Sequence, residues 1–274
     1  MSRDPLERIA AALERLIPAA PLPTDWYTAP AFVWNGTNAR SVDEIGAPAL
    51  EQLRGIDRQK AAVLENVERL ARGEAAHDML LWGARGMGKS ALVRAVVADI
   101  GYDVALVQVA PDALATLPAL FAVLAKVRRN FLVYLDDLGF AQGDSVGPRH
   151  LRSWLEGGVE ARPHNVRLAV TSNRRAIVPR YLSEQGVSGE DGPVNPRDAL
   201  DDLQALADRF GLSVGFHAAS QDDYLAIVAA YAEPLGLMWD EGEALQWAKR
   251  RGARSGRTAW QFVTEIAGRA RQPL

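Results

Sequence analysis

The stretch MLLWGARGMGKSALVRAVVADI (residues 79–100) joins an apolar run to an expected helix through a loop that contains three glycines. Residues 83–90 of this stretch, GARGMGKS, match the pattern G-x-x-x-x-G-K-[ST], the Walker A motif or P-loop. Glycines allow a backbone to turn back so that successive N–H groups point inward and form a site for an anion. The positive end of the helix that begins near Lys89 adds to this attraction. The stretch therefore predicts a phosphate-binding loop between a strand and a helix.

The motif gives individual roles to the residues of the loop. Lys89 is expected to reach the β- and γ-phosphates of a nucleotide, and Ser90 is expected to offer its hydroxyl to Mg²⁺. We therefore predict ATP and Mg²⁺ as the cofactors. The residues expected to line the phosphates are Gly83, Ala84, Arg85, Gly86, Met87, Gly88, Lys89, Ser90 and Ala91.

Strands and helices alternate around this loop. Because such alternation produces a parallel sheet covered by helices on both faces, we predict an α/β fold, a P-loop NTPase αβα sandwich with a five-stranded parallel sheet. After residue 220 the pattern is helical throughout, which predicts a second, small helical domain at 219–274. The expected strands are 77–82, 103–109, 130–138, 166–173 and 211–216, and the expected helices between them are 90–100, 117–129 and 148–161.

The first 45 residues precede the alternation. Residues 5–17 have apolar positions at helical spacing and predict an amphipathic helix, whereas residues 18–50 are rich in proline and aromatic residues and predict an extended arm. The arm could lie on its own domain, which is the simpler interpretation, or contact another subunit. We divide the chain into this helix and arm at 1–45, a nucleotide-binding domain at 46–218 and the helical domain at 219–274.

A long polar stretch separates the fourth and fifth expected strands. It covers residues 174–208, and loops of this length are often functional. Within it, Tyr181 and Leu182 could grip a substrate in a central pore, although packing beneath the stretch is the more ordinary interpretation.

Acidic and amide residues follow two of the strands. Asp136 and Asp137 end the apolar run FLVYL, and Asn173 ends LAVTS. Ligands of open α/β sheets bind at the carboxyl ends of the strands. We therefore expect Asp136 to hold Mg²⁺, Asp137 to activate the attacking water and Asn173 to position it. Thr171 and Ser172 are weaker candidates.

Composition narrows the classes of function. The chain of 274 residues has no cysteine, which excludes disulfides, thiolate zinc sites and cysteine nucleophiles. A net charge of −3 gives no overall attraction to nucleic acid or to anionic membranes. Apolar runs are too short to span a bilayer, and the four histidines lack the spacing of metal ligands. We expect a cytoplasmic protein with no membrane contact and no metal other than Mg²⁺.

The motifs GARGMGKS, FLVYLDD and TSN, followed by a helical domain, resemble those of AAA+ ATPases over residues 45–274. The segments YLSEQ, NPRDALDD, LADRFGL and DDYLAIV are similar to the bacterial DUF815 group of ATP-binding proteins. LDDLG is similar to helicase loaders and transposition helpers. The resemblance implies that the helical domain is a lid and that the protein is a homo-oligomer, as a ring or an ATP-dependent assembly.

The resemblance also implies further site residues. Gly55 and Ile56 match the motif that contacts adenine, and Arg209 matches the arginine finger that reaches the γ-phosphate of a neighbouring subunit. Arg257 matches the lid arginine that senses nucleotide in its own subunit. The alternative interpretation of Arg209 is that it forms a surface ion pair. The role of the lid arginine could belong to a neighbouring cation (Arg250, Arg251 or Arg254) in place of Arg257.

One departure from the AAA+ pattern concerns hydrolysis. Many members have Asp-Glu where this chain has Asp136 and Asp137, so the second carboxylate is one methylene shorter. Hydrolysis could therefore be slow, although the helicase-loader branch shares the Asp-Asp pair.

Three functions are compatible with these residues. The one we favour is an ATPase that hydrolyses ATP at subunit interfaces to remodel or move a macromolecular partner, a protein of unknown identity. A DNA-associated loader or helper that uses ATP as a conformational switch is the second, since the basic run 248–257 could touch phosphates as well as form a solvated helix face. A small-molecule phosphotransferase, with the long polar stretch as its lid, is the third.

Overall fold

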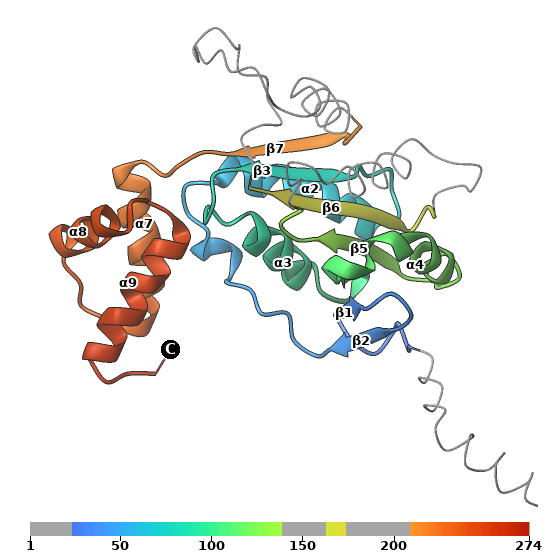
Figure 1. The fold of residues 1–274 in the computed structure, drawn as a ribbon, viewed down its shortest axis with the longest axis horizontal. Coiled ribbons are helices and arrows are strands. Elements are labelled where there is room, and N and C mark those ends of the chain that lie inside the picture. Colours follow the sequence, from blue (N-terminus) through green and yellow to red (C-terminus); the bar gives the residue numbers. More distant parts are fainter. Residues whose placement is uncertain (1–23, 139–162, 174–208, 274) are drawn as a thin grey trace, which may run out of the picture.

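A computed structural model describes residues 24–138, 163–173 and 209–273 of the chain (Figure 1). Among the described helices, none combines the length and the apolar character that crossing a bilayer requires. Outside these ranges lie three parts of the sequence prediction: the helix at 5–17, the helix at 148–161, and the stretch at 174–208 with Tyr181 and Leu182.

One sheet organises the described residues. Its strand order is β2-β1-β4-β5-β6-β3-β7, and every neighbouring pair is parallel except β1 with β2. The predicted α/β fold with five parallel strands is confirmed, and the arm adds two strands that the sequence did not indicate. The strands are β1 (Ala31–Trp34), β2 (Ala39–Val42), β3 (Met79–Gly83), β4 (Val104–Val109), β5 (Asn130–Leu135), β6 (Val166–Ser172) and β7 (Leu212–Phe216).

The arm lies on its own domain as part of the sheet. Strand β1 pairs in parallel with β4, and the rings of Trp26 and Phe32 pack with centroids 4.7 Å apart in the core. Arg129 fastens the start of the arm, because its Nη1 donates to the carbonyl oxygens of Trp26 and Ala29, at 2.7 Å each. Burial lowers the pKa of Arg129, although the neighbouring Tyr102 and Tyr27 oppose this shift.

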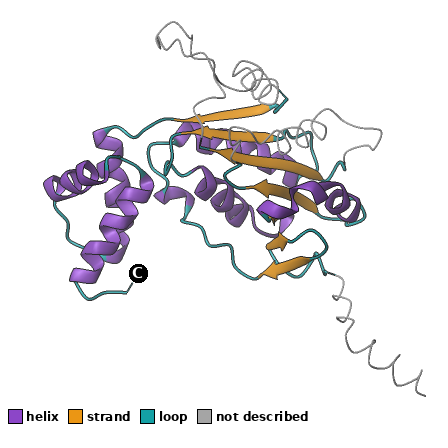
Figure 2. Ribbon diagram, in the orientation of Figure 1, coloured by secondary structure: helices purple, strands orange, loops and turns teal. Residues whose placement is uncertain are grey.

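Helices cover both faces of the sheet (Figure 2). Alternate residues of β5 point to opposite faces: Leu132 and Tyr134 join the core that contains α2 and α3, whereas Phe131 and Val133 join the core that contains α4. The helices are α2 (Asp57–Ala71), α3 (Lys89–Ile100) and α4 (Leu117–Leu124), with short 3-10 turns η1 (Leu50–Gln52), η2 (Gly101–Asp103) and η3 (Pro111–Thr116).

Helix α4 is shorter than the 117–129 that the sequence predicts. The side chain of Asn165, 4% exposed, donates from Nδ2 to the carbonyl oxygens of Leu124, Val127 and Arg129 at 2.8–3.0 Å. Because these carbonyls bond to a side chain from the loop before β6, the chain turns toward β5 after Leu124 and no longer continues the helix.

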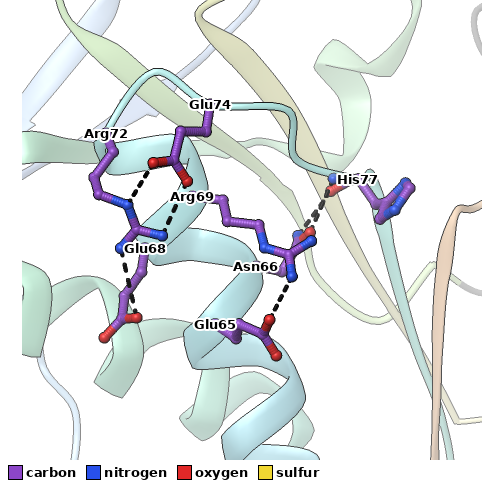
Figure 3. Close-up of polar contacts among 7 residues, drawn as sticks. All are labelled: Glu65, Asn66, Glu68, Arg69, Arg72, Glu74 and His77. Carbon is purple, nitrogen blue, oxygen red and sulfur yellow. Dashed lines mark hydrogen bonds and ion pairs between the residues drawn. The ribbon is translucent and has the colours of Figure 1, made fainter.

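A buried side chain fixes the end of α2 (Figure 3). Asn66 donates from Nδ2 to the carbonyl of His77 and accepts from the His77 backbone N–H, at 2.9 Å each. Around this pair, Arg72 forms exposed ion pairs with Glu68 and Glu74 on the surface, which contribute little to stability. Asn66 therefore ties α2 to the segment that leads into β3.

The remaining helices form a separate group beside the sheet (Figure 1). Ser220, Asp240 and Ser255 each accept a hydrogen bond from a backbone N–H three residues ahead, which caps the helix that follows. We refer to this group as the lid: α7 (Gln221–Ala232), η5 (Glu233–Leu235), α8 (Glu241–Arg251) and α9 (Gly256–Arg269).

The contact between the ends of β3 and β7 generates a prediction about stability. Gly83 has φ +119°, and a Cβ there would lie 2.1 Å from the carbonyl oxygen of Phe216, a backbone atom that cannot rotate away. We expect Gly83→Ala to lower the free energy of unfolding by about 3 kcal/mol, measured by urea denaturation.

Gly236→Ala is the matched control. Gly236 also has a positive φ, +63°, but nothing lies within 4 Å of the added Cβ. Its cost should be limited to the left-handed backbone, about 1 kcal/mol. Equal losses in the two variants would show that the contact with Phe216 is not what requires glycine.

Candidate functional site

The P-loop has the strand–loop–helix context that its motif requires. Strand β3 ends at Gly83 and α3 begins at Lys89, while Gly86 and Gly88 have φ values of +76° and +88°. The backbone N–H of Ala84 donates to the carbonyl of Phe216 at 2.8 Å, which anchors the start of the loop to β7. Positive φ at these glycines lets the loop turn back over the start of α3.

Lys89 lies folded inside the loop. Its side chain is 4% exposed, and Nζ donates to the carbonyl oxygens of Gly83 at 3.1 Å and Ala84 at 2.9 Å, and to Oδ1 of Asn173 at 2.9 Å. Burial lowers the pKa of Lys89, and the charge of Asp137 opposes this shift. The ammonium is thus held beside the loop by neutral oxygens, which anionic oxygens of a phosphate could replace.

One carboxylate oxygen of Asp136 accepts hydrogen bonds from three hydroxyl groups. Its Oδ1 accepts from Tyr134 at 2.6 Å, from Ser90 at 2.7 Å and from Thr171 at 2.8 Å. Partial burial raises the pKa of Asp136, but these hydrogen bonds favour the charged form and hold the pKa below its ordinary value. The carboxylate is therefore kept ionised next to the Ser90 hydroxyl.

The oxygens of Ser90 and Asp136 fit Mg²⁺. This ion prefers hard oxygen ligands and is usually bound by one or two protein groups together with phosphates of the substrate. No group of three or more histidine, cysteine or acidic residues that could hold a metal occurs in the part of the chain that the structure describes. A cation held jointly by Ser90, Asp136 and a nucleotide is compatible with this donor set.

Asp137 is directed differently from Asp136. It has a φ of +48°, and its backbone N–H donates to Oγ1 of Thr171 at 2.8 Å. Its carboxylate accepts a hydrogen bond from Nδ2 of Asn173, whose Oδ1 binds Lys89. Asn173 thus links the lysine of the P-loop to the second carboxylate.

Two residues of this arrangement were underestimated from the sequence. Thr171 was a weaker candidate and Tyr134 was not a candidate, yet both hydroxyls bind Asp136. Tyr134 precedes Asp136 by two residues, and side chains two apart in a strand share a face. That spacing was the available indication for Tyr134, whereas the bond from Thr171 depends on the pairing of β5 with β6.

The predicted adenine residues lie next to the loop. Gly55 has φ +74° and Ile56 is 4% exposed directly before α2. A Cβ on Gly88 would lie 3.7 Å from Cδ1 of Ile56 and 3.8 Å from Cδ2 of Leu53. Leu53, which no motif in the sequence indicated, therefore adjoins the same side of the loop.

The lid touches the P-loop directly. The backbone N–H of Arg257 donates to the carbonyl of Gly86 at 3.2 Å, and a Cβ on Gly86 would lie 2.9 Å from Oγ of Ser255. The N-terminal end of α9 therefore rests on the loop, and the charge of Arg257 is close enough to lower the pKa of Lys89.

A cleft of about 810 Å³ opens between the P-loop and the lid. Its lining contains three cations and no carboxylate, which is favourable for an anion. The lining residues are Ala84, Arg85, Met87, Asn173, Ala218, Ala219, Gln221, Leu245, Ala248, Lys249, Gly252, Ala253 and Arg254.

Two predicted residues lie apart from these groups. Ala91 is in the first turn of α3 and packs against the core. Arg209 lies before β7, whose first residue pairs with the first residue of β3 and whose last residue pairs with Gly83. Arg209 therefore lies at the amino end of the strands, whereas Lys89 lies beyond their carboxyl end, a strand length of roughly 15 Å away.

Comparisons with known proteins agree with this architecture. The model of the family described as "Protein of unknown function (DUF815)" matches residues 27–270. No curated protein matches the sequence.

Solved structures share the fold at low sequence identity. The Thermotoga maritima RuvB Holliday junction branch migration motor has a TM-score of 0.53 and 14% identity, over 84% of this chain and 68% of that one. The Aeropyrum pernix ORC1 protein in complex with DNA has a TM-score of 0.57 and 16% identity, over 80% of this chain and 62% of that one. The AAA+ fold that the sequence resemblance implied is confirmed.

The three hydroxyls on Asp136 generate a prediction about Tyr134. In Tyr134→Phe one donor to the charged carboxylate is lost, so the pKa of Asp136 should rise toward its ordinary value. We expect a loss of about 1 kcal/mol in the free energy of unfolding at pH 7. Because a lowered pKa stabilises only the ionised form, the difference from the parent should shrink as the pH falls below 3.8, the ordinary value for Asp.

Tyr224→Phe provides the control. The Tyr224 hydroxyl is buried without a hydrogen-bond partner in the described part of the chain, so its removal should not destabilise the protein. Urea denaturation between pH 3 and pH 7 gives both comparisons. Equal effects of the two substitutions at all pH values would contradict the role of Tyr134.

Proposed function

This chain belongs to the DUF815 family, and from its site we propose that it is an AAA+ ATPase that binds ATP with Mg²⁺ and hydrolyses it. The observation that carries the proposal is the hydrogen-bonded chain from Lys89 through Asn173 to Asp137, beside the contact between Ser90 and Asp136. A cation, two carboxylates, a hydroxyl and an amide thus meet at the mouth of one phosphate loop.

Lys89 and the loop bind the phosphates in this proposal. The ammonium exchanges the carbonyl oxygens of Gly83 and Ala84 for phosphate oxygens, while the loop N–H groups hold the remaining charge. Ser90 and Asp136 hold Mg²⁺, which neutralises charge on the phosphates when it is bound. Ile56 and Leu53 offer an apolar surface next to the loop for the base.

Asp137 orients the attacking water and accepts its proton. The hydrogen bond from Asn173 fixes the direction of this carboxylate relative to Lys89. Because aspartate is one methylene shorter than the glutamate of many AAA+ ATPases, we expect slow hydrolysis rather than its absence.

Arg209 completes the site of a neighbouring subunit. Its position at the end of the strands opposite Lys89 argues against a role in its own site and supports contact with a second copy. A planar guanidinium stabilises the charge of a transferred phosphoryl group. Hydrolysis would then require an oligomer. In this proposal, conformational changes of the oligomer on hydrolysis remodel or move a macromolecular partner, and that partner is a protein.

A DNA-associated loader or helper is the second candidate. The observation that favours it is the exposed basic end of α8, where the guanidinium of Arg251 lies 4.8 Å from the ring centroid of Trp247. DNA affinity that falls steeply with salt would support this candidate, and no DNA binding at low salt would remove it.

Lys89→Ala tests ATP binding. The loss of a buried cation that contacts phosphate should weaken ATP affinity by about a hundredfold, measured by calorimetry with Mg²⁺. Undiminished ATP affinity of the Lys89→Ala protein would refute the proposed site.

Asp137→Asn tests the role of the second carboxylate in hydrolysis. This variant should bind ATP within about threefold of the parent yet hydrolyse it at least tenfold more slowly. Hydrolysis at the parent rate would contradict the role of Asp137.

Complementation tests the role of Arg209 in trans. Arg209→Ala protein should bind ATP but hydrolyse it about a hundredfold more slowly, and Lys89→Ala protein should be inactive because its own sites are empty. Mixing the two should restore activity, since intact Arg209 then reaches intact P-loops. If the mixture stays as inactive as its components while assembling normally, Arg209 does not act across the interface.

A further inference from the structure

Two exposed tyrosines meet at the amino end of the sheet. Tyr27, before β1, is 57% exposed, and Tyr102, before β4, is 69% exposed. The hydroxyl of Tyr27 accepts a hydrogen bond from the backbone N–H of Arg128 at 2.9 Å. The guanidinium carbon of Arg129 lies 5.7 Å from the ring centroid of Tyr102. Segments far apart in the sequence therefore place two aromatic rings and two cations on one surface.

This surface lies away from the candidate site. Strands β1, β4 and β5 are parallel, and the tyrosines and arginines precede them, whereas Asp136 follows β5. The six residues of β5 separate Arg129 from Asp136 by roughly 20 Å. Figure 1 shows α4, which precedes Arg129 in the chain, and the lid at opposite ends of the sheet. A ligand on this surface is therefore not the nucleotide of the proposed function.

The two tyrosines are exposed but held in place. Nε of Arg129 donates to the carbonyl of Tyr102 at 3.2 Å, and Nη1 of Arg129 is itself bonded to the arm. The backbone N–H of Tyr27 donates to Oδ1 of Asp25 at 3.0 Å. Aromatic side chains on a fixed backbone bury apolar area when a partner binds and lose little conformational entropy, which favours affinity.

The cations on this surface lack carboxylate partners. Lys126 and Arg128 are exposed, and neither forms an ion pair within the ranges that the structure describes. Arg129 bonds to neutral carbonyls, and its Nη2 is buried without a hydrogen-bond partner among the described residues. Three positive charges are thus not neutralised by carboxylates in this part of the chain.

We propose that Tyr27, Tyr102, Lys126, Arg128 and Arg129, the tyrosine patch, bind a partner protein through a segment that combines acidic and aliphatic side chains. Tyrosine and arginine are among the residues that contribute most binding energy at protein interfaces, where polar residues usually surround the centre. The aliphatic side chains pack on the two rings, and a carboxylate pairs with Arg128 and Lys126.

Acidic neighbours of the tyrosine patch favour a protein over a nucleic acid. Asp25 lies two residues before Tyr27, Asp103 directly follows Tyr102, and both carboxylates are exposed. A row of phosphates that reached the cations would also meet these carboxylates, whereas a protein segment can place an acidic residue at the cations alone. The guanidinium of Arg129 also occupies one face of the Tyr102 ring, which is then not available to a stacked base.

Peptide display on the full-length protein tests the proposal. A library of random peptides of about twelve residues should yield binders with aspartate or glutamate beside leucine, isoleucine or valine. In fluorescence anisotropy, the affinity of one such synthetic peptide should fall about tenfold in Tyr102→Ala and in Arg128→Ala. Arg128→Ala should also make peptide binding less sensitive to KCl, because a charge pair is lost.

Met238→Ala and Arg58→Ala are the matched controls. They remove an exposed apolar side chain and an exposed cation elsewhere on the protein, so peptide affinity should stay within twofold of the parent. Because Tyr102 and Arg128 are exposed as well, we expect all four variants to have urea midpoints that match the parent.

Three outcomes would overturn the proposal. Selected peptides without acidic residues, or equal peptide affinity of the patch variants and the parent, would show that the tyrosine patch does not bind an acidic segment. Binding of single-stranded oligothymidylate that is lost in Arg128→Ala would make the partner a nucleic acid. An oligomer of the parent that dissociates in Tyr102→Ala, measured by sedimentation, would show that a second copy occupies the tyrosine patch.

Discussion

The buried ammonium of Lys89 is the interaction on which the candidate site depends. It bonds to two carbonyls of the P-loop and to Asn173, and so joins the end of β3 to the end of β6. A buried cation is costly unless hydrogen bonds satisfy it. The same hydrogen bonds that meet this cost hold the lysine beside the P-loop, which is where the proposed phosphate binding requires it.

The two carboxylates at the end of β5 differ because their partners differ. Three hydroxyls bind one oxygen of Asp136, which favours its charged form and directs it toward Ser90. Asp137, one residue later and with a left-handed backbone, turns to Asn173 instead. Adjacent residues of the same type therefore have different partners, which is what our proposal requires if one is to hold a cation and the other is to orient water.

The arm strands and the lid lie on two sides of the candidate site. On one side, β1 and β2 extend the sheet beyond β4, held by aromatic packing and by Arg129. On the other, the lid rests on the P-loop through a backbone hydrogen bond from Arg257, with cations along the cleft. The lid and the loop also share an apolar core, which contains Met87 of the loop and Phe262 of α9.

The sequence by itself determined the P-loop, the five parallel strands and the residues at their carboxyl ends, because glycine spacing and apolar runs are local properties of a chain. Only the tertiary structure decided that the arm joins the sheet, that α4 ends at Leu124 and that Tyr134 and Thr171 share Asp136. It also decided that Lys249 and Arg254 line the cleft. The pairing of the arm, the end of α4 and the hydrogen bond from Thr171 depend on contacts between segments distant in sequence, which no local pattern encodes, whereas the spacing of Tyr134 and Asp136 was a local indication.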